Sequence, residues 1–328
     1  MTYLRVRQPV RAADYVKIVT RFTYLHGMEK TSDLPGKSRG IGSFLSRNKA
    51  RLIGKLAPGM ADSQIDSMLF IPKAADSKAA RLPRGFEQFF IKTGDGKLQA
   101  YQTGRGPTVV FVHGWGGGAY HFFPLMRGLA RIGYSSLAFD HLGHGRSDRK
   151  PATLQQGVAT CNEVFTEIRK SRDGLCALVG HSTGCIQIAN AREPIVKGLP
   201  LLMIAPVFNY KLYFLRRLVQ LGLPKDMVKQ YANRFSRTYR DEYQKLELAD
   251  RLERYSDETA IAHDQTDVET AASDSIEFCE RHPLTRLVLT RHTDHLRIIQ
   301  SESVWQVLKS QLNYDDSTIG YSADIIHR

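Results

Sequence analysis

The sequence GHSTG at residues 180–184 directly follows the apolar run Leu175–Val179 and precedes a helical run over Cys185–Asn190. A serine at a sharp turn between a strand and a helix stands proud of the sheet, and flanking glycines permit a tight backbone that a Cβ would obstruct. We therefore expect Ser182 to be a nucleophile and the N–H of Thr183, at a helix N-terminus, to be an oxyanion donor. The rival interpretation is an ordinary glycine-rich turn.

A second glycine-rich turn, HGWGGG at residues 113–118, follows the apolar run TVVFV at 108–112. A loop so poor in side chains lets backbone N–H groups approach a ligand closely, and the N–H of Trp115 is the expected second oxyanion donor. Dinucleotide binding is a rival, because residues 114–119 fit the looser GxGxxA pattern and Asp140 follows the next strand. That rival leaves the turn at Ser182 unexplained.

Outward from these two turns, short apolar runs alternate with longer helical patterns from Phe86 onward. This alternation is typical of a mostly parallel sheet with helices on both faces, an α/β fold. We expect strands near residues 87–92, 97–103, 108–112, 135–139, 175–179, 200–205, 259–263 and 286–290. Helical patterns cover residues 119–131, 153–170, 183–191, 269–280 and 296–311.

The remaining segments complete the expected domain organisation. Residues 1–85 form a basic, largely helical N-terminal extension, and residues 86–207 and 257–328 form the two parts of the α/β core, the second with a short C-terminal tail. About fifty residues of helical character, 208–256, interrupt the rhythm of strands. We expect this insertion to be a small helical lid, because open α/β sheets bind ligands at the carboxyl ends of their strands.

The net charge of +13 is concentrated near the N-terminus, where residues 1–57 carry 12 Lys and Arg against 3 Asp and Glu. We find no nucleic-acid-binding module to accompany it, so nucleic acid is not an expected partner. The apolar stripe over Ala12–Leu25 packs on the body of the protein or lies as a basic amphipathic helix on an anionic membrane. No secretory signal or membrane-spanning run is recognisable, which favours the cytoplasm with peripheral membrane contact as an option.

With both turns in view, the chain resembles the α/β-hydrolase superfamily, and within it esterase and lipase-like members with a short helical lid. A third feature agrees, since FDHLGHGRS at residues 139–147 matches the DxxGHGxS turn of these enzymes. The resemblance covers Phe86–Leu312 and implies a mostly parallel eight-stranded sheet flanked by helices. It does not extend to the first 85 residues.

In the family, the acid and then the histidine follow the serine along the chain. The sequence HDQTD at residues 263–267 resembles the HGxxD motif, with Asp264 in place of the glycine. The resemblance implies Asp267 as the acid, while Asp264 stays open as an alternative. His263 is expected to be structural.

The resemblance implies His295 as the base, and His292 is the alternative. Both lie in RHTDHL at residues 291–296, where the family more often has a glycine directly before the histidine. A metal pair built from the HxxH spacing is a further alternative, but no third ligand lies nearby in the sequence, so we expect no metal. The four cysteines form no CxxC pair and indicate neither zinc nor a disulfide framework.

These residues together predict hydrolysis of a carboxylic ester through an acyl-enzyme, without a cofactor. Histidine can take the serine proton and return it to the leaving group, and a carboxylate fixes its tautomer. The expected substrate is an ester or thioester with an apolar part. The residues expected to line its site are His113, Gly114, Trp115, Tyr120, Phe122 and His181. A thioesterase, an acyltransferase and a non-catalytic binding protein of the same fold remain alternatives.

Overall fold

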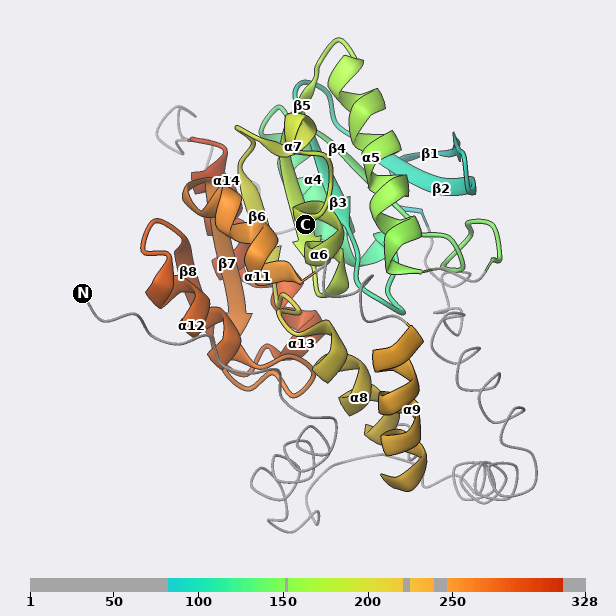
Figure 1. The fold of residues 1–328 in the computed structure, drawn as a ribbon. Helices are drawn as coiled ribbons and strands as arrows, with labels where there is room; N and C mark the ends of the chain where they lie inside the picture. The colour runs from blue at the N-terminus through green and yellow to red at the C-terminus, as the bar shows by residue number, and fades with distance from the viewer. Residues whose placement is uncertain (1–81, 151–152, 221–224, 239–246, 315–328) are drawn as a thin grey trace, which may run out of the picture. The chain divides into compact units, whose positions relative to one another are not determined.

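The computed structural model describes residues 82–150, 153–220, 225–238 and 247–314 (Figure 1). The expected N-terminal extension, with its helix over 12–25, lies outside the described residues except for its last four positions. The expected C-terminal tail beyond residue 314 lies outside them too. By their contacts, residues 209–220 and 225–238 belong to one compact unit, and the other described residues belong to a second unit that contains the sheet.

The second unit is built on one eight-stranded sheet with the strand order β1-β2-β4-β3-β5-β6-β7-β8. The first two strands pair in antiparallel fashion and β2 is antiparallel to β4, whereas every later pairing is parallel. The strands are β1 (Glu87–Thr93), β2 (Gly96–Thr103), β3 (Thr108–Val112), β4 (Ser135–Phe139), β5 (Leu175–His181), β6 (Leu201–Ile204), β7 (Thr259–Asp264) and β8 (Arg286–Thr290). All eight expected strands are present, and the expected α/β-hydrolase sheet is confirmed.

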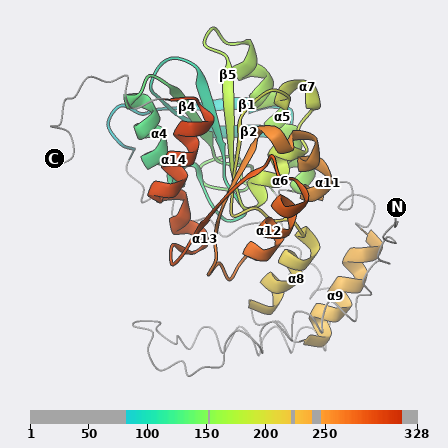
Figure 2. The same ribbon diagram turned by 90° about the vertical axis from the view of Figure 1, so that its left-hand side faces the viewer.

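Helices cover both faces of this sheet (Figure 2). One face carries α4 (Phe123–Arg131) and α14 (Glu302–Gln311), and the other carries α5 (Leu154–Lys170), α6 (Thr183–Ala189), α11 (Leu248–Leu252) and α12 (Ala272–Arg281). Short elements complete the unit: η1 (Ala119–Phe122), α7 (Glu193–Val196), η2 (Glu253–Glu258), α13 (Asp294–Arg297) and η3 (Ile298–Gln300).

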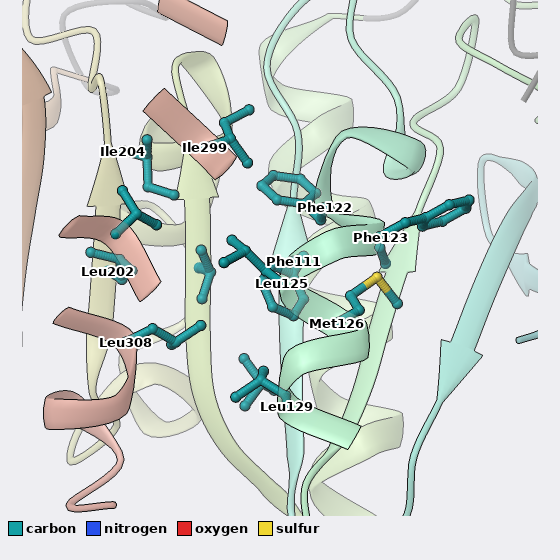
Figure 3. Close-up of a cluster of buried hydrophobic side chains, with 14 of the residues drawn as sticks. Phe111, Phe122, Phe123, Leu125, Met126, Leu129, Leu202, Ile204, Ile299 and Leu308 are labelled. Carbon is teal, nitrogen blue, oxygen red and sulfur yellow. The ribbon is translucent and has the colours of Figure 1, made fainter. Parts of the chain in front are cut away.

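Strand residues alternate between the two faces because successive side chains of a strand point in opposite directions. Phe111 of β3 and Leu202 and Ile204 of β6 face α4 and α14, where they pack with Phe122 and Leu308 (Figure 3). The strands β3 and β6 are buried along their whole length, as expected of a parallel sheet covered on both sides. This packing fixes the carboxyl ends of β3, β5, β7 and β8, which carry the loops of the candidate site.

Two of the described helices, α5 and α14, begin at a residue whose side chain accepts a backbone N–H of the first turn. Thr153 and Gln156 form a reciprocal capping box at the start of α5. The single helix expected over 296–311 is instead α13, η3 and α14, because Ser301 has an extended backbone and accepts the N–H of Val304. This serine is the cap that the periodicity of the sequence did not resolve.

The first unit contains α8 (Tyr210–Gln220) and α9 (Lys225–Thr238), which pack on each other. Their rings Phe214 and Tyr231 stack with centroids 6.3 Å apart. Across the parts of the chain that the structure describes, no helix combines the length and the apolar character needed to cross a bilayer.

Candidate active site

The nucleophile turn is built at the end of β5. Ser182 has φ 54° and ψ −121°, a backbone conformation that residues with a Cβ rarely adopt and that costs on the order of 1–3 kcal/mol. Its N–H donates to the carbonyl of Ile204 on β6 at 2.9 Å, and its carbonyl accepts from the N–H of Cys185 at 3.1 Å. The neighbouring strand and the first turn of α6 therefore hold the strained serine in place.

Two glycines allow the backbones to converge on this serine. A Cβ on Gly184 would lie 2.2 Å from the carbonyl oxygen of Val112, so α6 could not approach β3 with any other residue there. A Cβ on Gly114 would lie 2.7 Å from the Cβ of Ser182 and 3.2 Å from its Oγ. The HGW turn therefore lies directly against the serine side chain, as the oxyanion role expected of it requires.

The two expected oxyanion donors are linked to each other. The N–H of Trp115 donates to the side-chain Oγ1 of Thr183 at 2.8 Å. The N–H of Thr183 is the first of α6, so it lies too early in the helix to have an intrahelical acceptor. The hydroxyl of Thr183 is a participant that the sequence did not single out, because the motif specifies only a backbone group at that position.

Buried histidines hold the glycine-rich turn. The Nε2 of His144 accepts the N–H of Gly116 at 3.0 Å, and the Nε2 of His113 accepts the N–H of His141 at 3.0 Å. In both rings Nδ1 donates to a backbone carbonyl, of Leu142 and Gly114 respectively. Burial lowers the pKa of His113 to about 4 and that of His144 to about 3, which keeps both rings neutral, as accepting at Nε2 requires.

Asp140 is engaged by the protein's own groups. Its carboxylate accepts the N–H of Ala119 at 2.9 Å and the N–H of Arg146 at 3.1 Å. It is 1% exposed, and Gly145 has φ +49° with its Cα so close that a Cβ would overlap the carboxylate. Asp140 therefore joins the end of the glycine-rich turn at residues 113–118 to the turn at residues 143–146, which accounts for it without the ribose ligand of the dinucleotide interpretation.

The acid of the candidate triad is fully enclosed. One oxygen of Asp267 accepts the N–H groups of Glu269 and Thr270 at 2.8 and 3.0 Å, and the other accepts the hydroxyl of Thr270 at 2.9 Å. Burial alone would raise the pKa of Asp267, but hydrogen bonds from His263, His295 and the Thr270 backbone hold it far below its usual range. The carboxylate is therefore ionised at neutral pH. Thr270 is another residue that the sequence did not indicate.

His295 is the histidine that contacts this acid. Its Nδ1 lies 2.7 Å from Oδ2 of Asp267, and an ionised carboxylate can only accept, so Nδ1 carries the proton. The alternative His292 is exposed. The backbone carbonyl of His295 accepts from Nε2 of His181 at 2.8 Å, and the two rings lie 4.7 Å apart. His181 thus joins the nucleophile turn to the loop of the base.

His263 is structural, as its place at the end of a strand suggested. It is completely buried, with Nδ1 at 2.7 Å from the hydroxyl of Ser275 and Nε2 at 3.1 Å from that of Thr270. Because Thr270 gives its own proton to Asp267, Nε2 of His263 is the donor in that contact. The ring is therefore a strut between α12 and the loop of the acid.

The loop of the base forms without the glycine that the family more often has. His292 and Asp294 take φ +66° and +58°, values that favour glycine. Asp294 compensates locally, since its carboxylate accepts the N–H groups of Leu296 and Arg297 at 3.0 and 2.9 Å. The carboxylate of Asp264 accepts from Thr293, which lies between the two residues with positive φ.

The bulky side chains expected to touch substrate differ in their exposure. Phe122 is fully buried in the core, with its ring centroid 5.1 Å from that of Phe111, so it is a packing residue (Figure 3). His113 and His181 are buried and bonded to backbone groups, which makes them supports of the two turns. Trp115 and Tyr120 are partly exposed and are the two bulky side chains of the set that retain accessible surface. In the described ranges, no three metal-ligating side chains converge as a metal site would need.

Curated relatives match parts of the chain. An epoxide hydrolase of Caballeronia sordidicola is 30% identical over 108 residues, which cover 33% of each chain. A 2-(acetamidomethylene)succinate hydrolase of Mesorhizobium japonicum is 36% identical over 87 residues, or 26% of this chain and 31% of that protein. The chain thus spans about a third of the length of these relatives.

Solved structures and a family model cover more of it. An esterase of Pyrococcus furiosus has a TM-score of 0.55 at 19% identity and covers 74% of this chain and 96% of its own. Est1E of Butyrivibrio proteoclasticus, solved with ferulic acid, has a TM-score of 0.52 at 17% identity and covers 69% and 99%. The model of the alpha/beta hydrolase family matches residues 109–303, more than half of the chain. The chain therefore belongs to the alpha/beta hydrolase family.

Proposed function

We propose that the protein hydrolyses a carboxylic ester through an acyl-enzyme on Ser182, with His295 as general base and Asp267 as its orienting acid. The observation that carries the proposal is the 2.7 Å contact between His295 Nδ1 and the buried carboxylate of Asp267. Both residues follow strands parallel to β5, so their loops lie at the same edge of the sheet as the strained serine.

The chemistry follows from the protonation states. With Nδ1 donating to Asp267, Nε2 of His295 is the basic nitrogen that takes the hydroxyl proton as Ser182 Oγ attacks the carbonyl carbon. The C–O bond to the leaving group then breaks, and the imidazolium returns the proton to the departing alcohol. A water molecule, deprotonated by the same histidine, attacks the acyl carbon and frees the acid and the serine.

The developing oxyanion needs donors that are already in place. The N–H groups of Thr183 and Trp115 flank the serine, and losing one such donor typically lowers the rate about 10²- to 10³-fold. In the free protein the N–H of Trp115 is bonded to the hydroxyl of Thr183. That hydroxyl holds the donor at the turn until the oxyanion forms beside it.

Epoxide hydrolysis is the other reaction that the relatives bring forward, and the residue at position 182 disfavours it. Epoxide hydrolases of this fold mostly use an aspartate there, whose ester intermediate water can cleave. Attack of a serine hydroxyl on an epoxide carbon would form an ether, and an ether has no carbonyl for water to attack. A serine nucleophile is therefore suited to acyl transfer and would be trapped by an epoxide.

The test is hydrolysis of p-nitrophenyl esters from acetyl to palmitoyl by the wild type, Ser182→Ala and the control Ser310→Ala on the exposed face of α14. We expect activity and fluorophosphonate labelling in the wild type and the control and neither in Ser182→Ala. Labelling that persists in Ser182→Ala would refute the assignment of the nucleophile. Turnover of an epoxide by the wild type, without loss of ester activity over time, would refute the argument against that reaction.

A further inference from the structure

A second buried carboxylate, that of Asp264, lies beside the proposed triad but does not face its histidine. One oxygen accepts the N–H and hydroxyl of Thr266 at 2.8 and 2.5 Å. The other accepts the hydroxyls of Thr290 and Thr293 at 2.9 and 2.7 Å and the N–H of Thr293 at 2.9 Å. Five donors thus converge on a side chain that has no exposed surface.

Asp264 joins the loop of the acid to the loop of the base. It is the last residue of β7 and lies opposite Thr290, the last residue of β8. Its carbonyl accepts the N–H of Asp267 at 3.1 Å, while its carboxylate reaches Thr293, two residues before His295. Asp264 therefore contacts the backbone of both loops, at Asp267 itself and at Thr293.

The loop of the base requires such a restraint. His292 and Asp294 both have positive φ without being glycine, and such conformations persist only where the surroundings hold them. Thr293 lies between them, and both its N–H and its hydroxyl end on the same oxygen of Asp264. Asp264 therefore holds the central residue of the strained segment, Thr293.

We propose that Asp264 is a positioning residue that sets the orientation of His295 through Thr293. The proposal rests on the proposed function, because it concerns the base of that triad. The proposal also accounts for the aspartate at 264, where the related motif has glycine. Its carboxylate restrains, by hydrogen bonds to Thr293, a base loop that lacks the glycine the family more often has. Asp264 is thereby excluded as the acid, since both its oxygens are committed to threonines.

A purely structural role makes a different prediction. Replacing a residue that only stabilises the fold lowers the amount of active protein, and each molecule that still folds keeps its kcat. Replacing a positioning residue lowers kcat in every folded molecule and leaves KM nearly unchanged, because the substrate does not touch that residue. Small displacements of a catalytic group can lower rates by about 100-fold.

The experiment compares Asp264→Asn and Asp264→Gly with the control Asp148→Asn, which alters a partly exposed carboxylate bonded to the N–H of Lys97. In Asp264→Asn, whichever way the amide turns, one set of threonine donors meets an NH₂ group. Active sites are counted by fluorophosphonate titration to completion, and kcat is expressed per titrated serine. We expect kcat to fall about 10- to 100-fold in Asp264→Asn with KM within about 2-fold, and the control to match the wild type.

The threonine gives an independent test should the Asp264 variants fold poorly. Thr293→Ser keeps the hydroxyl and should retain kcat, whereas Thr293→Val should lose about 3- to 10-fold. The double variant Asp264→Asn with Thr293→Val should lose little more than Asp264→Asn alone. Wild-type kcat per titrated serine in Asp264→Asn and Thr293→Val would overturn the proposal. A wild type that fails to react with the fluorophosphonate would instead overturn the proposed function.

Discussion

Replacing Asp294 tests how the loop of the base forms without glycine. This residue has φ +58°, and its carboxylate accepts the N–H groups of Leu296 and Arg297 at the start of α13. Alanine removes that cap, at a cost of about 1 kcal/mol. It also keeps a Cβ in the left-handed region without the local hydrogen bonds that help aspartate there, which costs up to about 1–2 kcal/mol more.

Glycine at the same position separates the two effects. It loses the carboxylate, but it relieves the backbone strain, and as a capping residue it is only a few tenths of a kcal/mol worse than aspartate. We therefore expect the free energy of unfolding of Asp294→Ala to be about 1–3 kcal/mol lower than that of the wild type. Asp294→Gly should stay within about 1 kcal/mol of it, because chain entropy offsets part of the relief.

Urea unfolding followed by fluorescence measures this order, with Asp173→Ala, an exposed aspartate in the turn before β5, as the control. Equal slopes with urea across the variants would show that the comparison concerns stability alone. If Asp294→Ala proved as stable as Asp294→Gly, the backbone strain assigned to residue 294 would be refuted. If both matched the wild type, the cap would be refuted as well.

Three further outcomes are expected. Asp267→Asn should lower kcat about 10⁴-fold with little change in KM, because an amide can hold His295 in the wrong tautomer; steady-state kinetics on the preferred ester measures this. Thr183→Val should lower kcat about 5- to 10-fold and Thr183→Ser should not, since only the hydroxyl accepts the N–H of Trp115, and equal rates would contradict it. The depressed pKa values of Asp264 and Asp267 add stability above the unfolded-state value of about 3.9, and acid removes it. The urea concentration at the unfolding midpoint should therefore decrease as the pH is lowered below about 4. In Asp264→Asn this decrease should be smaller.

The sequence predicted the elements whose signals are local. Each strand is a short apolar run between turn residues, and the GHSTG turn is specified within five positions, so fold and nucleophile turn could be read directly. The resemblance to the hydrolase family then implied Asp267 and His295, which follow β7 and β8 in the structure. Those two assignments rest on the order in which the acid and the histidine follow the serine in the related family.

What could not be predicted depends on contacts between distant segments. The hydroxyl of Thr183 meets the N–H of Trp115 across 68 positions, and Asp264 meets Thr293 across 29. The replacement of glycine by aspartate in two loops looked like a departure from the motif. The hydrogen bonds by which the two carboxylates compensate for the missing glycines depend on the tertiary structure. Phe122 was likewise assigned to the substrate because its aromatic character is the same in a pocket and in a core.

The bond from His181 to the carbonyl of His295 spans 114 positions of the chain, and the segment 209–238 lies between its two ends in sequence. Every partner named in the network of the candidate triad comes from outside that segment. Exchange of residues 209–238 therefore leaves the sequence of all these named partners unchanged. A chimaera that carries another family member's residues in place of 209–238 is thus an engineering route that retains every residue named in that network.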